Sequence, residues 1–245
     1  MSRDDAWLWR QPLAHRGLHD RDAGVPENSL VAFERAAEAG IPVEFDVRLD
    51  ADGVPVVVHD DDLERLTGEP GRVADLRSAE LQRRRLAGTD HPIPTLRDVL
   101  DCLAGRVGAM VEIKNPSHRA GPVEEATWGL LRDYDGPFCV ASFNPRTVRW
   151  FRTNAPAVIR GQTAGPLRDA EGLPGWLRPL LAVMAGNAFT APDFLSYDLR
   201  GLPSRAVDFW RRRGLAVITW TVTTPDDVVK ARAVADNFIY EGVEP

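Results

Sequence analysis

The sequence predicts an α/β fold in which parallel strands alternate with helices and close into a (β/α)₈ barrel. Short apolar, β-branched runs alternate with amphipathic segments along the chain, an order that favours parallel pairing. Seven or eight such units in 245 residues suit a closed barrel better than an open sheet. No glycine-rich dinucleotide or P-loop fingerprint opens a helix, which further weakens the open-sheet alternative.

Nine apolar runs are the expected strands, and the helices fall between them. Ser29 caps one helix that stops at Gly40, and Thr95 caps another with Asp98 three residues later, as in a capping box. Three more helices begin near Pro145, Ser204 and Pro225. The strand ranges are 13–17, 43–49, 54–59, 109–114, 138–143, 158–162, 194–198, 216–222 and 237–240.

We expect one domain over residues 1–245, with an insertion at about 60–94 that is long, charged and only partly helical in pattern. The net charge of −6 argues against a nucleic-acid-binding protein, whose footprint is usually basic. No apolar run approaches ~18 residues, so we expect no membrane span. The N-terminus is acidic and lacks a long apolar segment, which predicts a cytoplasmic protein.

Two carboxylates lie two residues apart inside one apolar run. Glu44 and Asp46 alternate with Val43, Phe45 and Val47, and residues i and i+2 of a strand point to the same face. We therefore expect both carboxylates inside the barrel. Burying two like charges is costly unless a cation neutralises them. A divalent metal such as Mg²⁺ or Ca²⁺ suits such oxygen ligands, and arginine salt bridges across the barrel mouth are an equal alternative.

A second strand repeats this arrangement, because Glu112 and Lys114 share one face of the run at 109–114. Taken alone, the two residues are most simply an internal ion pair. Next to the first pair of carboxylates they would supply a third metal ligand and a cation for an anion site.

His15 and His59 end the first and third apolar runs. A lone histidine is usually structural. Two histidines and three carboxylates at the carboxyl ends of predicted strands are hard to explain as a core, because active sites of parallel barrels form at that end. Arg16 adds a planar fork that suits phosphate oxygens.

These residue types suit metal-assisted cleavage of a phosphodiester. A metal would stabilise the charge that develops on the phosphate oxygens. One histidine would take a proton from the attacking oxygen, and the other would give a proton to the leaving alkoxide. An ordinary histidine pKa of about 6.5 fits both tasks near neutral pH.

Nine short motifs follow one another along the chain: His15-Arg-Gly17, Pro26-Glu-Asn-Ser29, Glu44-Phe-Asp-Val47, 52–60, 63–68, Ile93-Pro-Thr-Leu96, Glu112-Ile-Lys114, Ser142-Phe143 and 219–222. Each motif is weak alone, but their order and spacing are together highly specific. On these motifs the sequence resembles, nearly end to end, the glycerophosphodiester phosphodiesterase family.

The resemblance implies a (β/α)₈ barrel with a small insertion after His59. It implies a divalent metal, usually Mg²⁺ or Ca²⁺ with Mn²⁺ as a further candidate, held by Glu44, Asp46 and Glu112. The implied acid–base pair is His59 as acid and His15 as base, an assignment that is favoured but reversible. The implied phosphate contacts are Arg16 and Lys114. The first attack comes either from a neighbouring glycerol hydroxyl, which gives a cyclic phosphate, or from water, and the sequence leaves both routes open.

Three further site positions have two interpretations each. Asn28 either hydrogen-bonds the phosphate or the attacking group, or it only shapes the loop before Ser29. Trp220 shares a strand face with apolar residues, which favours core packing, whereas the resemblance implies a wall of the glycerol pocket. Phe143 has the same two interpretations.

The last strand departs from the family pattern, since Glu241 stands where an aspartate is expected and the spacing is altered. We expect this change to affect packing and the pocket rim and to leave the histidine assignments intact. No catalytic role is expected for His118.

Two alternatives to a glycerophosphodiesterase stay open. The same site would act on a lysophospholipid, as in a lysophospholipase D-type enzyme, if an apolar funnel adjoined it. Trp176, Leu180, Leu181, Met184 and Phe189 are candidates for that funnel, although their helical spacing is more typical of core. A barrel that binds phosphate ligands without turnover is disfavoured, because no expected catalytic residue is missing. The expected substrate is a small-molecule glycerophosphodiester, and the sequence specifies neither its head group nor the oligomeric state.

Overall fold

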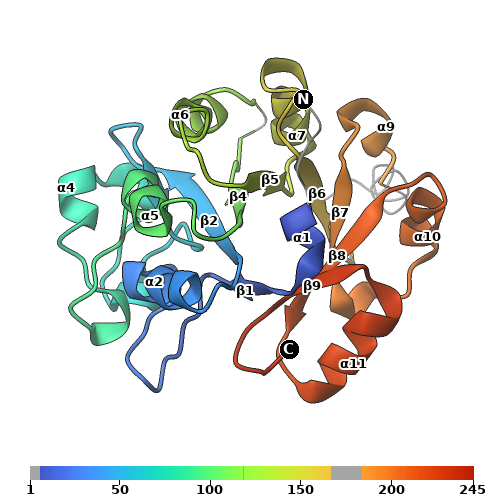
Figure 1. Ribbon diagram of the computed structural model, residues 1–245. Helices are drawn as coiled ribbons and strands as arrows, with labels where there is room; N and C mark the ends of the chain where they lie inside the picture. Colours follow the sequence, from blue (N-terminus) through green and yellow to red (C-terminus); the bar gives the residue numbers. More distant parts are fainter. Residues whose placement is uncertain (1–5, 118, 167–183) are drawn as a thin grey trace.

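The computed structural model describes residues 6–117, 119–166 and 184–245. Eight parallel strands form a closed ring, because β1 pairs with β2 on one side and with β9 on the other. Helices surround the ring (Figure 1), so the predicted (β/α)₈ barrel is confirmed. The barrel strands are β1 (Leu13–His15), β2 (Val43–Leu49), β4 (Ala109–Ile113), β5 (Phe138–Ser142), β6 (Arg160–Ala164), β7 (Phe194–Asp198), β8 (Ala216–Val222) and β9 (Asn237–Tyr240).

The run at 54–59 is not a barrel strand, which corrects the prediction. It forms β3 (Pro55–Val57), which pairs antiparallel with the end of β2, with Val57 opposite Val47. A tight turn reverses the chain: the Asp50 carboxylate accepts from two backbone N–H groups, and Gly53 has φ 77°. A parallel connection needs a dozen or more residues, so this short link permits only a hairpin. The hairpin brings the chain back toward the barrel mouth at His59.

The helices begin and end close to the predicted caps. The Ser29 hydroxyl accepts from the Ala32 N–H, and Thr95 and Asp98 form the expected capping box. Ser204 occupies the N-cap of its helix without a side-chain cap bond. The helices outside the insertion are α1 (Ala6–Arg10), α2 (Leu30–Glu38), α5 (Leu96–Leu103), α6 (Pro122–Leu131), α7 (Pro145–Asn154), α9 (Asn187–Thr190), α10 (Arg205–Arg211) and α11 (Pro225–Val234), with a 3₁₀ turn, η4 (Leu199–Gly201). Of these, α1, α6 and α9 are not among the predicted helices.

Apolar side chains form one core inside the barrel and others between the barrel and its helices. Inside, Met110, Phe194 and Ile218 pack with residues of α1, which covers the amino end of the barrel. Outside, Phe45 packs edge-to-face on Phe33 of α2. The alternation expected for β2 is therefore correct: its apolar residues face the helices and its carboxylates face inward.

The insertion at 60–94 has a small apolar core of its own. Leu63, Leu66, Leu81 and Leu86 pack there with residues of β3. Its short elements are α3 (Glu64–Thr67), η1 (Val73–Asp75), α4 (Ser78–Leu81) and η2 (Leu86–Gly88). Across the residues that the structure describes, no helix is long and apolar enough to cross a membrane.

Candidate active site

Strand register brings three carboxylates together at the carboxyl end of the barrel. Asp46 lies opposite Glu112 across β2 and β4, and Glu44 lies opposite His15 across β2 and β1. Ligand oxygens of the three carboxylates all lie within 4.8 Å of one another. Glu44 and Asp46 are buried, with exposed fractions of 3% and 1%. Such crowding of buried acids requires a compensating positive charge.

Lys114 supplies part of that charge. Its ammonium lies 2.9 Å from Asp46 Oδ1 and also contacts Glu112. Burial opposes the charge on Asp46, but Lys114, His59 and Arg16 outweigh burial and hold the pKa of Asp46 below its ordinary value. Burial, and then the charges of the other two acids, raise the pKa of Glu44 well above its ordinary value. Within this coupled pair, therefore, Asp46 carries the charge and Glu44 tends to hold a proton.

Each predicted catalytic histidine pairs with its own carboxylate through Nδ1. Nδ1 of His15 lies 2.5 Å from Glu241 Oε2, and Nδ1 of His59 lies 2.7 Å from Asp60 Oδ1. The other ring nitrogen of His15 points toward the three clustered carboxylates, with Nε2 3.9 Å from Glu44. Burial lowers the pKa of His59, against the opposing charge of Asp46.

A chain of ion pairs links the two sides of the site. The Arg16 guanidinium donates to Glu27 at 2.6 Å, Glu27 accepts from Arg65 at 2.8 and 3.0 Å, and Arg65 also contacts Asp60. Burial opposes the charge on Glu27, but Arg65 and Arg16 outweigh it, so its pKa lies below the ordinary value. Because Asp60 holds His59, this network ties the guanidinium beside the acids to the second histidine.

The loop before α2 adds an amide to the acids. Asn28 is buried and its Nδ2 donates to Asp46 Oδ2 at 3.1 Å, while its Oδ1 is buried without a hydrogen-bond partner among the described residues. Arg16 and Asn28 both have φ 56°, a backbone region that residues other than glycine rarely adopt. The backbone N–H of Asn28 donates to the Arg16 carbonyl, which fixes the two residues against each other.

The acids, the histidines and the two cations line one cavity of about 140 Å³. Phe143 and Trp220 form an aromatic wall, with ring centroids 5.7 Å apart at 78°. Trp220 Nε1 is buried and has no hydrogen-bond partner among the described residues. The lining residues are His15, Arg16, Glu44, Asp46, His59, Glu112, Lys114, Phe143, Trp220, Thr221 and Ile239. Except for Asn28, which hydrogen-bonds Asp46, every residue singled out for the site lines this cavity.

The sequence reasoning missed four residues: Glu27, Asp60, Arg65 and Glu241. Three of them lie within or beside quoted motifs and were overlooked because only the side chains nearest the reaction were assigned. Glu241 was noticed as a departure expected to affect packing and the pocket rim, but its direct contact with His15 was not predicted. His118 lies outside the described residues, as do Trp176, Leu180 and Leu181 of the predicted funnel. Of the remaining two funnel residues, Met184 is buried in a core cluster and Phe189 is exposed.

The donor set fits a hard divalent cation. Three carboxylates converge with no softer ligand among them, which is the chemistry of Mg²⁺, Ca²⁺ or Mn²⁺ sites. Burial, and then the like charges that meet there with insufficient compensation, raise the pKa of Glu44. These three residues could therefore hold a metal ion.

The chain matches the model of the glycerophosphoryl diester phosphodiesterase family over residues 15–240. It belongs to this family. Enzymes of the family are phosphoric diester hydrolases, and this chain is one of them. Human glycerophosphodiester phosphodiesterase 1 is 28% identical over 243 residues, a match that covers 88% of this chain and 72% of the relative. The enzyme from Caldanaerobacter subterraneus is 27% identical, with 95% and 94% covered.

Solved structures of this family share the fold. A phosphodiesterase from Oleispira antarctica, determined with its product sn-glycerol-3-phosphate, has a TM-score of 0.79 at 24% identity and covers 95% of this chain and 93% of its own. The Thermotoga maritima glycerophosphodiester phosphodiesterase has a TM-score of 0.68 at 26% identity, with 93% and 92% covered. The barrel is thus the fold of the family.

Proposed function

We propose that this protein hydrolyses glycerophosphodiesters to an alcohol and sn-glycerol 3-phosphate in a metal-dependent reaction. The observation that carries the proposal is the convergence of three carboxylates and two histidine–carboxylate pairs on one cavity. The product bound in the Oleispira antarctica structure supports the choice of substrate class.

Glu44, Asp46 and Glu112 would hold the metal, Mg²⁺ or Ca²⁺ in the first place. When bound, such an ion would neutralise charge that develops on the phosphoryl oxygens. Arg16 and Lys114 would bind the remaining phosphate oxygens, since both are cations that line the cavity.

His15 would act as base and His59 as acid. His15 would take the proton of the attacking hydroxyl, from water or from a neighbouring glycerol hydroxyl, as the new P–O bond forms. His59 would protonate the leaving alkoxide as the old P–O bond breaks. The neighbours of the histidines support this order. Asp60 shares its charge with Arg65, which is always cationic, so it offsets the positive charge of a protonated His59 only in part, which favours proton release from His59.

The cavity favours a glycerol moiety over an acyl chain. Its volume is about 140 Å³, and Trp220 Nε1 offers a buried donor for a hydroxyl group. A lysophospholipid would need an apolar extension, and neither Met184 nor Phe189 lines this cavity. We therefore place lysophospholipids second among the candidate substrates.

A product assay tests the proposal. Release of glycerol 3-phosphate from glycerophosphocholine, glycerophosphoethanolamine and glycerophosphoglycerol would be measured with EDTA, Mg²⁺, Ca²⁺ or Mn²⁺, beside lysophosphatidylcholine. We expect metal-restored turnover of the water-soluble diesters. His15→Ala and His59→Ala should abolish it while the fold survives, and His91→Ala, in the insertion, is the matched control. Turnover of the lysolipid alone would refute the substrate, and full activity of both histidine variants would refute the mechanism.

A further inference from the structure

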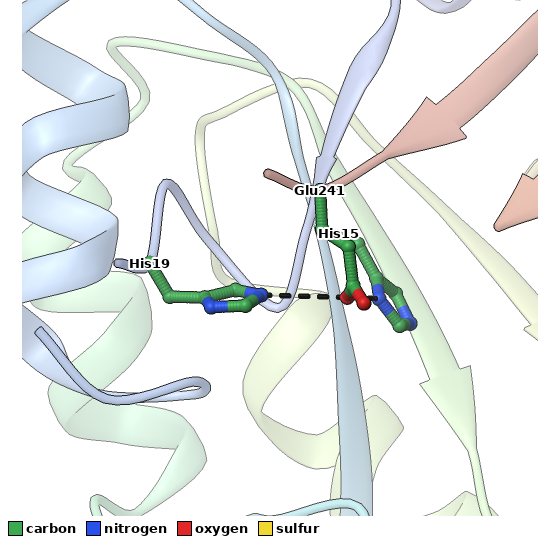
Figure 2. A group of neighbouring side chains, drawn as sticks. All are labelled: His15, His19 and Glu241. Atoms are coloured by element: carbon green, nitrogen blue, oxygen red, sulfur yellow. Dashed lines mark hydrogen bonds and ion pairs between the residues drawn. The ribbon is translucent and has the colours of Figure 1, made fainter. Parts of the chain in front are cut away.

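Glu241 lies between two histidines beside the candidate active site (Figure 2). Its Oε2 is 2.5 Å from Nδ1 of His15 and 3.4 Å from Nε2 of His19. His19 lies in the loop after β1, and Glu241 directly follows β9. The two segments meet because β1 pairs with β9 where the barrel closes, with Ala14 opposite Tyr240. The backbone N–H of Glu241 donates to the Val222 carbonyl at 3.0 Å, which anchors the residue to β8.

Two histidines and a carboxylate are also ligands that zinc prefers. The observed geometry favours hydrogen bonding instead. Ligands of a tetrahedral zinc ion lie about 2 Å from the metal and therefore more than 3 Å from one another. The contact of 2.5 Å between His15 and Glu241 is too short for two ligands of one ion, whereas a charge-assisted hydrogen bond draws its two partners into direct contact.

The hydrogen bond determines where His15 carries its proton. The hydrogen bond from His15, and then the neighbouring His19, hold the pKa of Glu241 well below its ordinary value, so the group is a carboxylate and can only accept. In neutral His15 the proton must then be on Nδ1. Nε2, which faces Glu44 and the cavity, is left with its lone pair. This is the tautomer that a general base requires.

We propose that Glu241 is a positioning residue that holds His15 in its base-competent tautomer and orientation, and that His19 holds Glu241 in place. This inference rests on the proposed function. The second part follows from exposure: one third of the Glu241 side chain is accessible, and a single hydrogen bond would leave the carboxylate free to turn toward solvent. His19 contacts it from the side opposite His15 (Figure 2).

The test compares three replacements of Glu241. Glutamine keeps the size but removes the charge, aspartate keeps the charge with a shorter reach, and alanine removes both. Glu244→Gln is the matched control. Glu244 lines a second pocket, separate from the active-site cavity, that His19 and Glu241 also line. His19→Ala removes only the second contact. For each variant, kcat and KM would be measured with glycerophosphocholine. The His15 tautomer would be read from long-range ¹H–¹⁵N NMR spectra of histidine-labelled protein, assigned with His15→Gln.

We expect Glu241→Ala and Glu241→Gln to lower kcat by roughly 100-fold or more, with KM within about twofold. The Glu241→Asp variant should retain more activity than Glu241→Gln, because the charge of the acceptor matters more for holding His15 than the size of the side chain. His19→Ala should lower kcat by less, about tenfold. The wild-type spectrum should show His15 protonated on Nδ1, and Glu241→Ala should add the Nε2-protonated form.

Other results would overturn the inference. If the kcat of Glu241→Gln equalled that of the wild type, or exceeded that of Glu241→Asp, Glu241 would have only a packing role. A wild-type His15 protonated on Nε2 would contradict the proposed tautomer. The spectrum needs no substrate, so a protein that shows the expected tautomer but cleaves no glycerophosphodiester would refute the proposed function and leave the positioning of His15 intact.

Discussion

Replacement of Glu44 by glutamine should stabilise the metal-free protein while it weakens metal binding. The side chain keeps its size but loses its charge, and Glu44 is 3% exposed among acids whose oxygens lie within 4.8 Å. Two unit charges at that separation repel by about 3.5 kcal/mol at an effective dielectric constant of about 20. Glu44 faces two such neighbours, and Lys114 and Arg16 offset them only in part.

The protein avoids most of this repulsion by keeping Glu44 protonated, and that has a cost which depends on pH. When folding raises the pKa of a carboxyl group, the protein loses stability as the pH rises from the group's unfolded-state pKa to its folded-state pKa. For Glu44 the unfolded value is 4.5, and the loss is about 1.4 kcal/mol for each pH unit. Between pH 5 and pH 7 the advantage of Glu44→Gln should therefore grow with pH, by at most about 1.4 kcal/mol for each pH unit.

Urea unfolding in EDTA, followed by tryptophan fluorescence at pH 5 and pH 7, measures this difference. Glu38→Gln, an exposed change on α2, is the control and should behave as wild type at both pH values. Calorimetry at pH 7 should show metal affinity at least 100-fold lower for Glu44→Gln, since a direct ligand is lost. Equal destabilisation at both pH values, or unchanged metal affinity, would refute the reasoning.

Three further changes test other parts of the site. Lys114→Met should destabilise the metal-free protein by about 3–5 kcal/mol, because two buried carboxylates lose their cation; a loss below about 1 kcal/mol in urea unfolding would contradict this. Asp60→Asn should lower kcat by roughly tenfold or more with little effect on KM, since His59 loses its charged acceptor; steady-state kinetics that match wild type would speak against the pairing. Trp220→Ala should mainly raise KM, by about tenfold for a lost wall and hydrogen bond, and a change confined to kcat would argue for a different role.

Much of the barrel and of the metal-type cluster follows from local sequence pattern. The alternation around Glu44 and Asp46 determines which side chains face inward, and register with β4 then brings Glu112 opposite Asp46. The direction of β3 was predictable in principle, because five residues between Leu49 and Pro55 cannot carry a parallel crossover. The error arose because an apolar run looks the same in either direction.

Other features depend on contacts that no local pattern contains. Glu241 is 226 positions from His15, and only closure of the barrel makes them neighbours. The sequence marked Glu241 as a departure from the family pattern without indicating its partner. The positive φ angle of Arg16 likewise comes from the packing of its loop between β1 and α2, since arginine does not favour that backbone region, whereas asparagine, as at Asn28, adopts it more readily.

The most direct test of the central claim is glycerol 3-phosphate release from glycerophosphocholine by EDTA-treated protein before and after Mg²⁺ or Ca²⁺ is added back. We predict negligible release in EDTA, recovery with metal in the wild type, and recovery in Glu44→Gln only at much higher metal concentration. Undiminished release in EDTA, or identical metal titrations of the wild type and Glu44→Gln, would contradict a metal-dependent phosphodiesterase built on these carboxylates.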